Sequence, residues 1–300
     1  YQLMSTLLRR PFLSSMLTVS GRRRVTNRIM IVICILATVL TVGAMLLVIG
    51  YVCYKGVSSL SLNVFTNGPA PQGEPNGGLL NGIVGTLELL GLGSIFGIPL
   101  GIFGGIYQAE SKSKLASFIR LLTDVLNSIP SIVLGLFAYV IVVLPMAQLN
   151  PGHAFSLFAG SIALGIIMIP TIIRTTEEIL KLVPNGLREA SLALGASEAR
   201  TMFSVILPAA REGIITGIML AIARIAGETA PLLFTAFGNM TFSMAIDEPI
   251  DALPLNIYKY ATSPWESLHN LAFAGALILI SFILILSILT RYILRNKMVH

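Results

Sequence analysis

The two residues best suited to chemistry are Arg224 and Glu228, which interrupt the otherwise apolar stretch AIARIAGETAPLL at 221–233. An arginine at the centre of an isolated membrane helix costs about 2.5–3.5 kcal/mol, so it must face a partner or a wet pathway. Arginine keeps its proton and offers a planar fork of donors, which suits an oxyanion better than a proton relay. We expect Arg224 to line an anion pathway, and a purely structural ion pair with Glu228 is the alternative.

The residues around this pair define its local geometry. Glu228 follows Arg224 by four positions, so in a continuous helix it shares a face with Arg224 and neutralises it when no anion is bound. Pro231 lacks the N–H that would bond to Gly227 and crowds that carbonyl, which predicts that the helix opens beside the pair.

The composition of the chain indicates a membrane protein. Hydrophobic residues are 55% of the 300 and charged residues only 11%, and the mean hydropathy is +0.84. Soluble domains normally contain about 25% charged residues. Most of the surface must therefore face lipid.

Apolar stretches that reach the roughly 20 residues needed to cross a bilayer give the number of spans. Five stretches are clear, and a sixth qualifies only if Arg224 and Glu228 are tolerated inside it. The first five are 29–53, 89–109 with a start near residue 81, 125–149, 155–173 and 271–290, and the sixth is 213–238. The predicted fold class is all-α, a polytopic integral membrane protein with six transmembrane helices.

Lysine and arginine placement supports six spans, because cytoplasmic loops retain these residues. They gather in residues 1–28, in the 110–120 loop and in the tail 291–300, whereas 54–80 and 239–270 contain one lysine each. We expect a basic cytoplasmic N-terminal segment at 1–28, a transmembrane domain at 29–290 and a basic cytoplasmic tail at 291–300. Positive loops beside anionic lipid account for the net charge of +6, so lipid rather than nucleic acid is the expected partner.

The second span contains a helical row of glycines at Gly93, Gly97, Gly101 and Gly105. A glycine at every fourth position forms a groove that lets another backbone approach closely. A nucleotide-binding glycine loop would end in Gly-Lys-Ser/Thr, and the sequence contains no Gly-Lys pair. We therefore expect no nucleotide site or cofactor in this chain. The three histidines are far apart and show no metal-ligand spacing, so a metal site and an enzymatic activity are not expected.

The third span begins with a polar stripe, because Asp124, Asn127, Ser128 and Ser131 recur at the spacing of one helical face. Such a stripe can form hydrogen bonds between helices or line a pathway. Asn127 and Ser128 are therefore further candidates for the pathway.

The long loop at 174–212 is too charged to enter lipid. Asn185 is the expected N-cap of a short helix that places Leu187, Ala190, Ser191 and Leu194 on one face, and Gly195 is expected to end it. A second helix is predicted from Ser197 to Pro208. Such a helix pair suits docking into a groove on a partner, and the alternative is an ordinary connector.

The spacing in this loop resembles a known family motif. Glu189-Ala190-Ser191, three residues, Gly195, nine residues and Val205-Ile206-Leu207-Pro208 resemble the EAA loop of permease subunits of ATP-binding-cassette (ABC) importers. The sequence departs from the family pattern at Ser191, where the family has Ala, and at Val205, where it has Ile. The resemblance covers about residues 29–290 and implies the type I ABC importer permease fold.

The resemblance also implies partners and a location. They are a second homologous permease subunit, two copies of a nucleotide-binding ATPase subunit that hold ATP and Mg, and an extracytoplasmic binding protein. This chain would be a non-catalytic, multi-pass subunit of the bacterial cytoplasmic membrane with both termini in the cytoplasm. The ATPase would grip the EAA loop through Leu187, Glu189, Ala190, Ser191, Leu194 and Gly195.

A second resemblance concerns the substrate. ARIAGETAPLLFTAFGN is similar to the fifth span of the A-type permeases of bacterial phosphate-specific importers, and NSIPSIVLGLF, with Asn127 and Ser128, is similar to their third span. In that family an arginine and the glutamate of Gly-Glu-Thr-Ala-Pro are important for transport. They correspond to Arg224 and Glu228, with Thr229 in the same motif, and a phosphate-binding protein would be the external partner.

Two other functions remain open. A permease for another oxyanion, such as sulfate, molybdate or phosphonate, would have similar spans. A proton-coupled secondary anion transporter, with Glu228 cycling a proton, would explain the charged pair but not the EAA loop.

Overall fold

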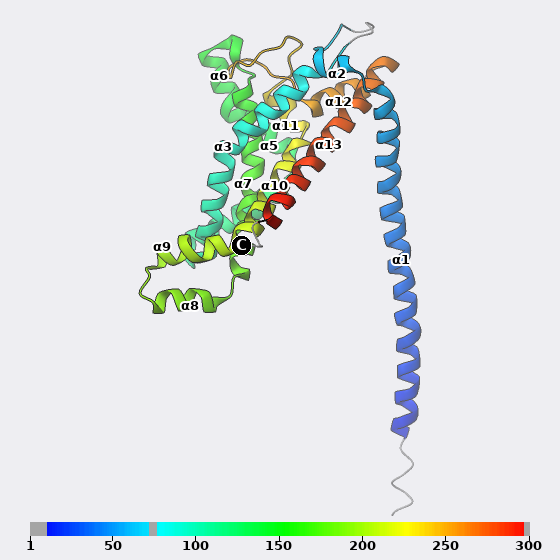
Figure 1. The fold of residues 1–300 in the computed structure, drawn as a ribbon, viewed down its shortest axis with the longest axis vertical. Coiled ribbons are helices and arrows are strands. Elements are labelled where there is room, and N and C mark those ends of the chain that lie inside the picture. Colours follow the sequence, from blue (N-terminus) through cyan, green and yellow to red (C-terminus); the bar gives the residue numbers. More distant parts are fainter. Residues whose placement is uncertain (1–10, 72–76, 297–300) are drawn as a thin grey trace, which may run out of the picture. The chain divides into compact units, whose positions relative to one another are not determined.

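The computed structural model describes residues 11–71 and 77–296 and separates into two units, 1–54 and 55–300 (Figure 1). The first unit consists of α1 (Pro11–Ser59) up to Tyr54, and its side chains from Arg23 to Tyr54 are mostly exposed. The part of α1 at Arg23–Ser59 is long and apolar enough to cross a membrane and contains the predicted span 29–53. Residues 1–10 of the basic N-terminal segment and 297–300 of the tail lie outside the described residues.

Five further candidate spans belong to the second unit. Three are single helices, namely α3 (Leu80–Glu110), α7 (Leu157–Leu182) and, within α13 (Glu266–Asn296), the segment Glu266–Tyr292. The other two spans are composite. Ser131–Leu149 joins α5 (Ser131–Ala138), the π-helix η1 (Tyr139–Val143) and α6 (Leu144–Leu149), and Glu198–Ala226 joins α9 (Glu198–Thr201), the π-helix η3 (Met202–Ile206) and α10 (Leu207–Ala226). The prediction of six spans is thus confirmed within the described residues.

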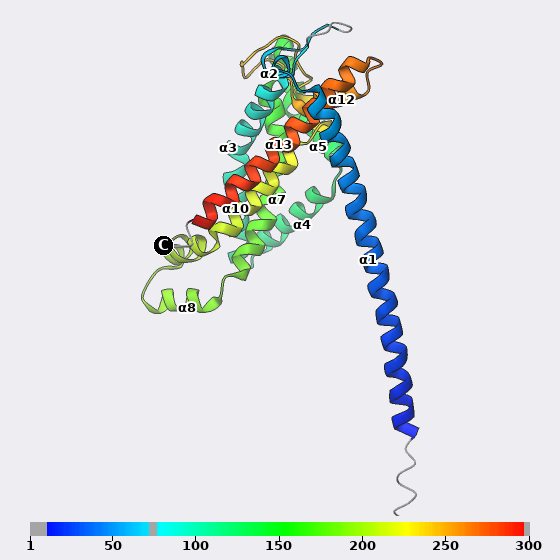
Figure 2. The ribbon, with the colours of Figure 1, turned by 45° about the vertical axis from the view of Figure 1, so that its right-hand side comes forward.

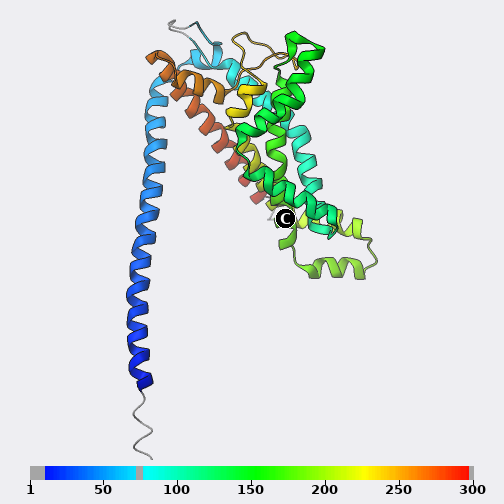
Figure 3. The same cartoon turned by 180° about the vertical axis from the view of Figure 1, so that it is seen from behind.

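Short helices lie between these spans. They are α2 (Leu62–Thr66), α4 (Lys114–Ser128), the 3₁₀-helix η2 (Pro151–His153), α8 (Asn185–Ala193), α11 (Ala230–Thr235) and α12 (Leu253–Ala261). Within the second unit, α8 and α9 lie at one end, and α2, α6 and α12 lie at the other (Figures 1 and 2). Figure 3 shows the same separation from behind. The two ends can therefore carry different functions.

The glycine row of α3 forms the predicted groove, and α7 fills it. All four glycines are buried. A side chain added at Gly101 would begin 2.6 Å from Cβ of Ile172, and one added at Gly105 would begin 2.5 Å from Cβ of Thr176. Because lipid tails are as apolar as leucine, this close backbone approach, rather than removal from water, holds the two helices together.

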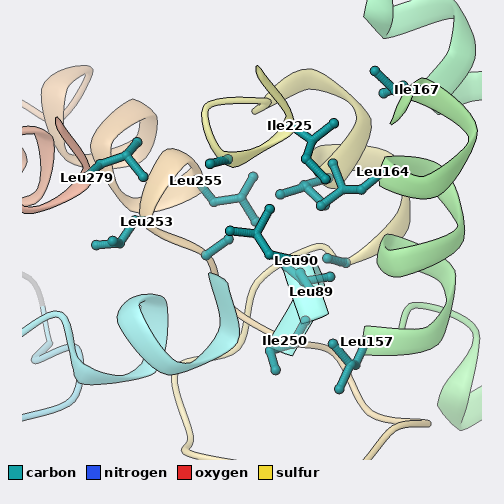
Figure 4. Close-up of a cluster of buried hydrophobic side chains, with 14 of the residues drawn as sticks. Leu89, Leu90, Leu157, Leu164, Ile167, Ile225, Ile250, Leu253, Leu255 and Leu279 are labelled. Atoms are coloured by element: carbon teal, nitrogen blue, oxygen red, sulfur yellow. The ribbon is translucent and has the colours of Figure 1, made fainter. Parts of the chain in front are cut away.

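The central core joins α3, α7 and α10. Leu89 and Leu90 of α3, Leu164 of α7 and Ile225 of α10 are buried together, and Leu253 and Leu255 of α12 complete the cluster (Figure 4). Ile225 is 1% exposed and directly follows the exposed Arg224. The core therefore anchors the end of α10 on one side and leaves the arginine outside it.

The structure corrects two predicted boundaries that lie at prolines, one of a span and one of a helix in the loop 174–212. The third span was predicted to start at residue 125, but α4 ends at Ser128, and Ile129 and Pro130 are extended before α5 begins at Ser131. The residue before a proline avoids helical backbone angles, which accounts for this break. The second helix of the loop was predicted to end at Pro208, but the structure shows no end there. The π-helix η3 precedes Pro208, and α10 continues through it to Ala226.

Candidate functional site

The centre of the site is the break that follows α10. This helix ends at Ala226, Gly227 caps it, and α11 begins at Ala230 with Pro231 in its first turn. The backbone N–H of Glu228 donates to the carbonyl of Ile225 at 3.2 Å, and the carbonyl of Thr229 accepts from Leu233 at 3.2 Å. The predicted opening of the helix beside the charged pair is therefore confirmed. The span that was predicted at 213–238 corresponds to the candidate span Glu198–Ala226, so its predicted end at residue 238 is wrong.

Arg224 has an uncharged partner on another helix. Its Nη1 donates to Oγ1 of Thr171 on α7 at 3.2 Å, and the residue is exposed. Among the described residues no carboxylate forms an ion pair with Arg224. The expected neutralisation by Glu228 one turn further along the helix is wrong for this conformation, because the helix ends before Glu228. The positive charge of Arg224 is consequently available to an anion.

Asn127 reaches the same turn of α7. Its Nδ2 donates to the carbonyl of Pro170 at 3.4 Å, and Pro170 directly precedes Thr171. One turn of α7 thus contacts both Asn127 from α4 and Arg224 from α10. The structure brings together these two residues, which are 97 positions apart in the sequence.

The other candidates of the pathway are placed differently. Glu228 and Thr229 lie in the break itself and are half-buried. Ser128 is exposed, and its hydroxyl donates to the carbonyl of Asp124 within α4 at 2.8 Å. Ser131 belongs to α5 beyond the break at Pro130, so the predicted four-residue polar face ends at Ser128. Only Asn127 of this stripe forms a hydrogen bond to the Pro170–Thr171 turn.

A second charged cluster, which the sequence did not reveal, surrounds Glu177 of α7. The Glu177 side chain is 1% exposed, and its Oε1 lies 2.7 Å from Nη2 of Arg120 and 2.5 Å from Nζ of Lys181. Arg174 lies 3.7 Å from the other carboxylate oxygen. The spacing of Glu177 and Lys181 was a readable signal of an i,i+4 pair, but the pairing with Arg120 across 57 residues was not. We name these four residues the Glu177 cluster.

The predicted coupling loop forms a helix, a glycine turn and a second helix. The helix α8 begins at Asn185, which is not its N-cap, because Pro184 with ψ 132° occupies that position. Gly195 has φ +83°, a left-handed conformation that favours glycine, so its expected role in ending the helix is confirmed.

Most of the coupling residues are exposed on this loop. Leu187, Glu189, Ala190, Leu194 and Gly195 are exposed, and Leu194 is 89% exposed. Ser191 faces inward instead, and its hydroxyl lies 2.8 Å from the hydroxyl of Thr201 in α9. The serine that departs from the family pattern therefore ties α8 to α9.

An ion pair joins α8 to the end of α3. The two guanidinium nitrogens of Arg188 each bond to one carboxylate oxygen of Glu110 at 2.5 Å. These hydrogen bonds to Glu110 raise the pKa of Arg188 above its ordinary value, against the opposing effect of burial. The pair fixes one side of α8 to the transmembrane helices while its leucines remain exposed.

Comparison with known proteins places this fold and sequence in a family. Residues 97–298 match the family described as binding-protein-dependent transport system inner membrane component. The phosphate transport system permease protein PstA of Haemophilus influenzae is 41% identical over 92% of this chain and 96% of the relative. The protein of the same name from Yersinia pestis is 44% identical over 92% of each chain.

Solved structures share the fold at low sequence identity. The inward-facing MetNI methionine ABC transporter has a chain that is 21% identical, with a TM-score of 0.57 over 73% of this chain and 96% of that chain. A bacterial alginate ABC transporter has a chain that is 14% identical, with a TM-score of 0.57 over 88% of this chain and 94% of that chain. The fold is therefore that of the type I ABC importer permeases. This chain is a multi-pass membrane protein that belongs to the binding-protein-dependent transport system inner membrane component family.

Proposed function

We propose that this chain is a membrane-spanning permease subunit of an ATP-driven importer that moves inorganic phosphate across the cytoplasmic membrane. The observation that carries the proposal is Arg224, a permanent cation at a helix break, which bonds to the hydroxyl of Thr171 and to no carboxylate of residues 11–71 and 77–296. Such a group can form charge-assisted hydrogen bonds to an oxyanion in passage. The names of the relatives in Haemophilus influenzae and Yersinia pestis favour phosphate among the oxyanions.

The proposal assigns chemistry to partner chains as well. ATP and Mg²⁺ are bound and ATP is hydrolysed in two copies of an ATPase subunit, which dock on the exposed face of α8. A second homologous permease completes the pathway, and an extracytoplasmic binding protein delivers phosphate. Arg188 of α8 pairs with Glu110 at the end of α3, and the basic residues Lys112 and Lys114 follow directly. Because cytoplasmic loops are rich in lysine and arginine, this end of the second unit faces the cytoplasm.

The test of the substrate is uptake of labelled phosphate in cells that lack this chain, with and without its re-expression. We expect re-expression to restore uptake and excess sulfate or molybdate to compete poorly. Equal competition by sulfate or molybdate would indicate a permease for another oxyanion. Uptake that depends on a proton gradient and not on ATP would indicate a secondary transporter.

The test of coupling is co-purification with the ATPase subunit. Gly195→Leu places a branched side chain at φ +83°, and Glu189→Lys reverses an exposed charge on α8. We expect both variants to remain in the membrane, to lose the ATPase during purification and to lose uptake. Retention of the ATPase and of uptake by both variants would make α8 an ordinary connector.

The test of orientation uses cysteines at two exposed positions in a variant without Cys34 and Cys53. We expect Thr262→Cys to react with an impermeant thiol reagent from outside the cell and Lys112→Cys to react only after the membrane is opened. The opposite pattern would reverse the proposed orientation.

A further inference from the structure

The helix α8 has no buried side chain, because all nine residues of Asn185–Ala193 are exposed or half-buried. Helices in folded proteins are normally held in place by the packing of an apolar face. Among the described residues, the side chains of α8 form hydrogen bonds or ion pairs with other elements at two positions, Arg188 and Ser191. The position of α8 relative to the membrane helices therefore depends largely on these two bonds and on the links at its ends.

The links at the two ends of α8 are short and not helical. Val183 and Pro184 join it to the end of α7, and both have extended backbone angles. At the other end Gly195, with φ +83°, lies in the turn that leads to α9. A few residues at the ends of an element are sufficient to absorb a hinge movement. Without a further bond, α8 would turn about these links when a partner pulls on it.

Arg188 and Glu110 supply that further bond, which joins α8 to the end of α3. Each of two guanidinium nitrogens bonds to one carboxylate oxygen at 2.5 Å, so the contact is bidentate. The two side chains are 32% and 35% exposed, which shields the pair in part from water. Bidentate pairs of arginine and carboxylate fix a direction as well as a distance, and they are the exception to the small contribution of surface ion pairs.

The charges of this pair are placed against the dipoles of their own helices. Glu110 is the last residue of α3, near the negative end of its dipole, and Arg188 is the fourth residue of α8, near the positive end. Each helix alone would be more stable with the opposite charge at that position. The contact between α3 and α8, and not the stability of either helix, therefore accounts for the placement of both residues.

The helix α3 connects this ion pair to the pathway. Its glycines pack against α7 so closely that a Cβ on Gly101 would lie 2.6 Å from Cβ of Ile172. Ile172 directly follows Thr171, whose hydroxyl accepts from Arg224. Closely packed elements have low compressibility, so they transmit a displacement from one to the next. A movement at the end of α3 consequently reaches the contact between Thr171 and Arg224.

We propose that Arg188 and Glu110 are positioning residues for transport, which carry a movement of α8 into α3 and α7 and from there to Thr171 and Arg224. The proposal rests on the proposed function, in which the ATPase docks on the exposed face of α8. With the pair intact, α8 moves as one body with α3 and α7. Without the pair, α8 turns about its links, and the ATPase hydrolyses ATP without moving the pathway.

The experiment measures phosphate uptake and ATP hydrolysis together, in proteoliposomes that contain the permease–ATPase complex, enclose ATP and are supplied with the binding protein. Arg188→Gln and Glu110→Gln each remove one charge of the pair. We expect the ATPase to co-purify with both variants and ATP hydrolysis to stay within about twofold of the parent, whereas phosphate uptake falls about tenfold or more, the loss expected for a charge-assisted bond. The amount of ATP hydrolysed per phosphate imported therefore rises.

A charge exchange tests the pair directly. Arg188→Glu combined with Glu110→Arg rebuilds the ion pair in the orientation that both helix dipoles favour. We expect the double variant to recover uptake and the ratio of ATP to phosphate to within about threefold of the parent, although Arg188→Glu alone transports as poorly as Arg188→Gln. The matched control is Lys112→Gln, which removes an exposed charge two residues after Glu110 that forms no ion pair within the described residues. It should behave like the parent.

Three results would overturn the proposal. An unchanged ratio of ATP to phosphate in both glutamine variants would show that α8 moves the membrane helices without the pair. Loss of the ATPase during purification of Arg188→Gln would place Arg188 in the docking surface instead. A well-assembled charge-exchange variant that transports as poorly as the single variants would show that the two charges do not act on each other.

These results are distinct from a failure of the proposed function. A parent complex that imports no phosphate would contradict the proposed function, whatever the variants do. If the parent imports another oxyanion, the ratio of ATP to that anion tests the pair in the same way. Phosphate import by the parent, together with parental ratios in both glutamine variants, would overturn the role of the pair and leave the permease function supported.

Discussion

Two charged regions of the second unit differ in burial and pairing: one has a buried, paired carboxylate and the other an exposed arginine without a carboxylate partner among the described residues. In the Glu177 cluster the carboxylate is buried and lies between Arg120, Lys181 and Arg174. At the break after α10, Arg224 is exposed, and within the part of the chain that the structure describes its side chain bonds only to a neutral hydroxyl. A buried charge needs partners, and the ion pairs of the cluster have a structural role, because they hold α4 against α7. The charge at the break has no such structural explanation, and this favours a role in transport.

Both regions use the same helix. Thr171 and Glu177 are six residues apart on α7, which corresponds to about 9 Å along the axis. The Glu177 cluster ties α7 to α4 at one level, and the Pro170–Thr171 turn contacts Asn127 and Arg224 at the next. The cluster therefore fixes the helix that presents a hydroxyl to Arg224 without neutralising it.

The largest expected effect comes from removing the unpaired cation. Arg224→Gln deletes a fixed charge whose hydrogen bonds to phosphate are of the strong, charge-assisted kind. We expect phosphate uptake to be nearly eliminated, while the amount of protein in the membrane and the co-purified ATPase remain normal. Uptake of labelled phosphate and immunodetection of both subunits measure the two results.

The variant Arg224→Lys serves as the comparison at the same position. It keeps the charge but loses the planar fork of donors, so we expect it to retain some uptake but less than the parent. Full uptake by a well-assembled Arg224→Gln complex would show that the arginine has only a structural role and would remove the contrast between the two regions.

The second prediction concerns the Glu177 cluster, from which the shared carboxylate is removed. Glu177→Ala removes the carboxylate that Arg120 and Lys181 share. Because those two side chains are 38% and 53% exposed, water can hydrate them, and the loss is that of hydrogen bonds to a charged group, about 1.5–3 kcal/mol. We expect a lower midpoint of thermal unfolding in detergent and less protein in the membrane, with uptake reduced in proportion to the amount of protein.

Glu178→Ala is the matched control for this prediction. Glu178 is the next residue along, is exposed and pairs with Arg174 at 2.8 Å. Exposed pairs are worth about 0–1 kcal/mol, so this variant should behave like the parent. Normal stability of Glu177→Ala together with lost uptake would transfer a transport role to the Glu177 cluster.

The difference between the two regions also explains what the sequence could predict. Six spans, the glycine groove of α3 and the opening beside Pro231 follow from local patterns of hydropathy, small residues and proline, and all three were predicted. Arg224 was identifiable because a charge in an apolar stretch stands out. Glu177 was not, because it lies among other charged residues in a segment that was interpreted as a loop.

Contacts between distant segments account for the remaining differences. The pairing of Arg224 with Thr171 and of Asn127 with Pro170 depends on how α4 and α10 pack against α7, which no local pattern encodes. The break between α4 and α5 was readable from Pro130, but the apolar run across it hid the boundary. A cavity beside α12 is lined by residues from 69–70, 238–240 and 251–268, which are distant in the sequence, so no local pattern could reveal it.

A third prediction concerns the acidic residue at the break. Glu228→Gln keeps the shape of the side chain and removes its charge. Because Glu228 does not pair with Arg224 in this conformation, we expect partial uptake, reduced several-fold, if the glutamate only adjusts the field around the arginine. Complete loss of uptake with normal assembly would instead identify Glu228 as an obligatory proton carrier.

The smallest expected effect comes from the hydroxyl that holds Arg224. Thr171→Val keeps the volume of the side chain but removes the only hydrogen-bond partner of the guanidinium among the described side chains. The hydrogen bond is long and exposed to water, so in spite of its charged donor we expect its loss to cost about 0.5–1.5 kcal/mol, which corresponds to a reduction in uptake of about two- to tenfold. Thr171→Ser should restore the uptake, because it restores the hydroxyl. Thr176→Val on the same helix is the control, since its buried hydroxyl has no partner and its loss should leave uptake intact. Equal uptake by Thr171→Val and the parent would mean that Arg224 is positioned by the break alone, and that α7 contributes nothing to the unpaired region.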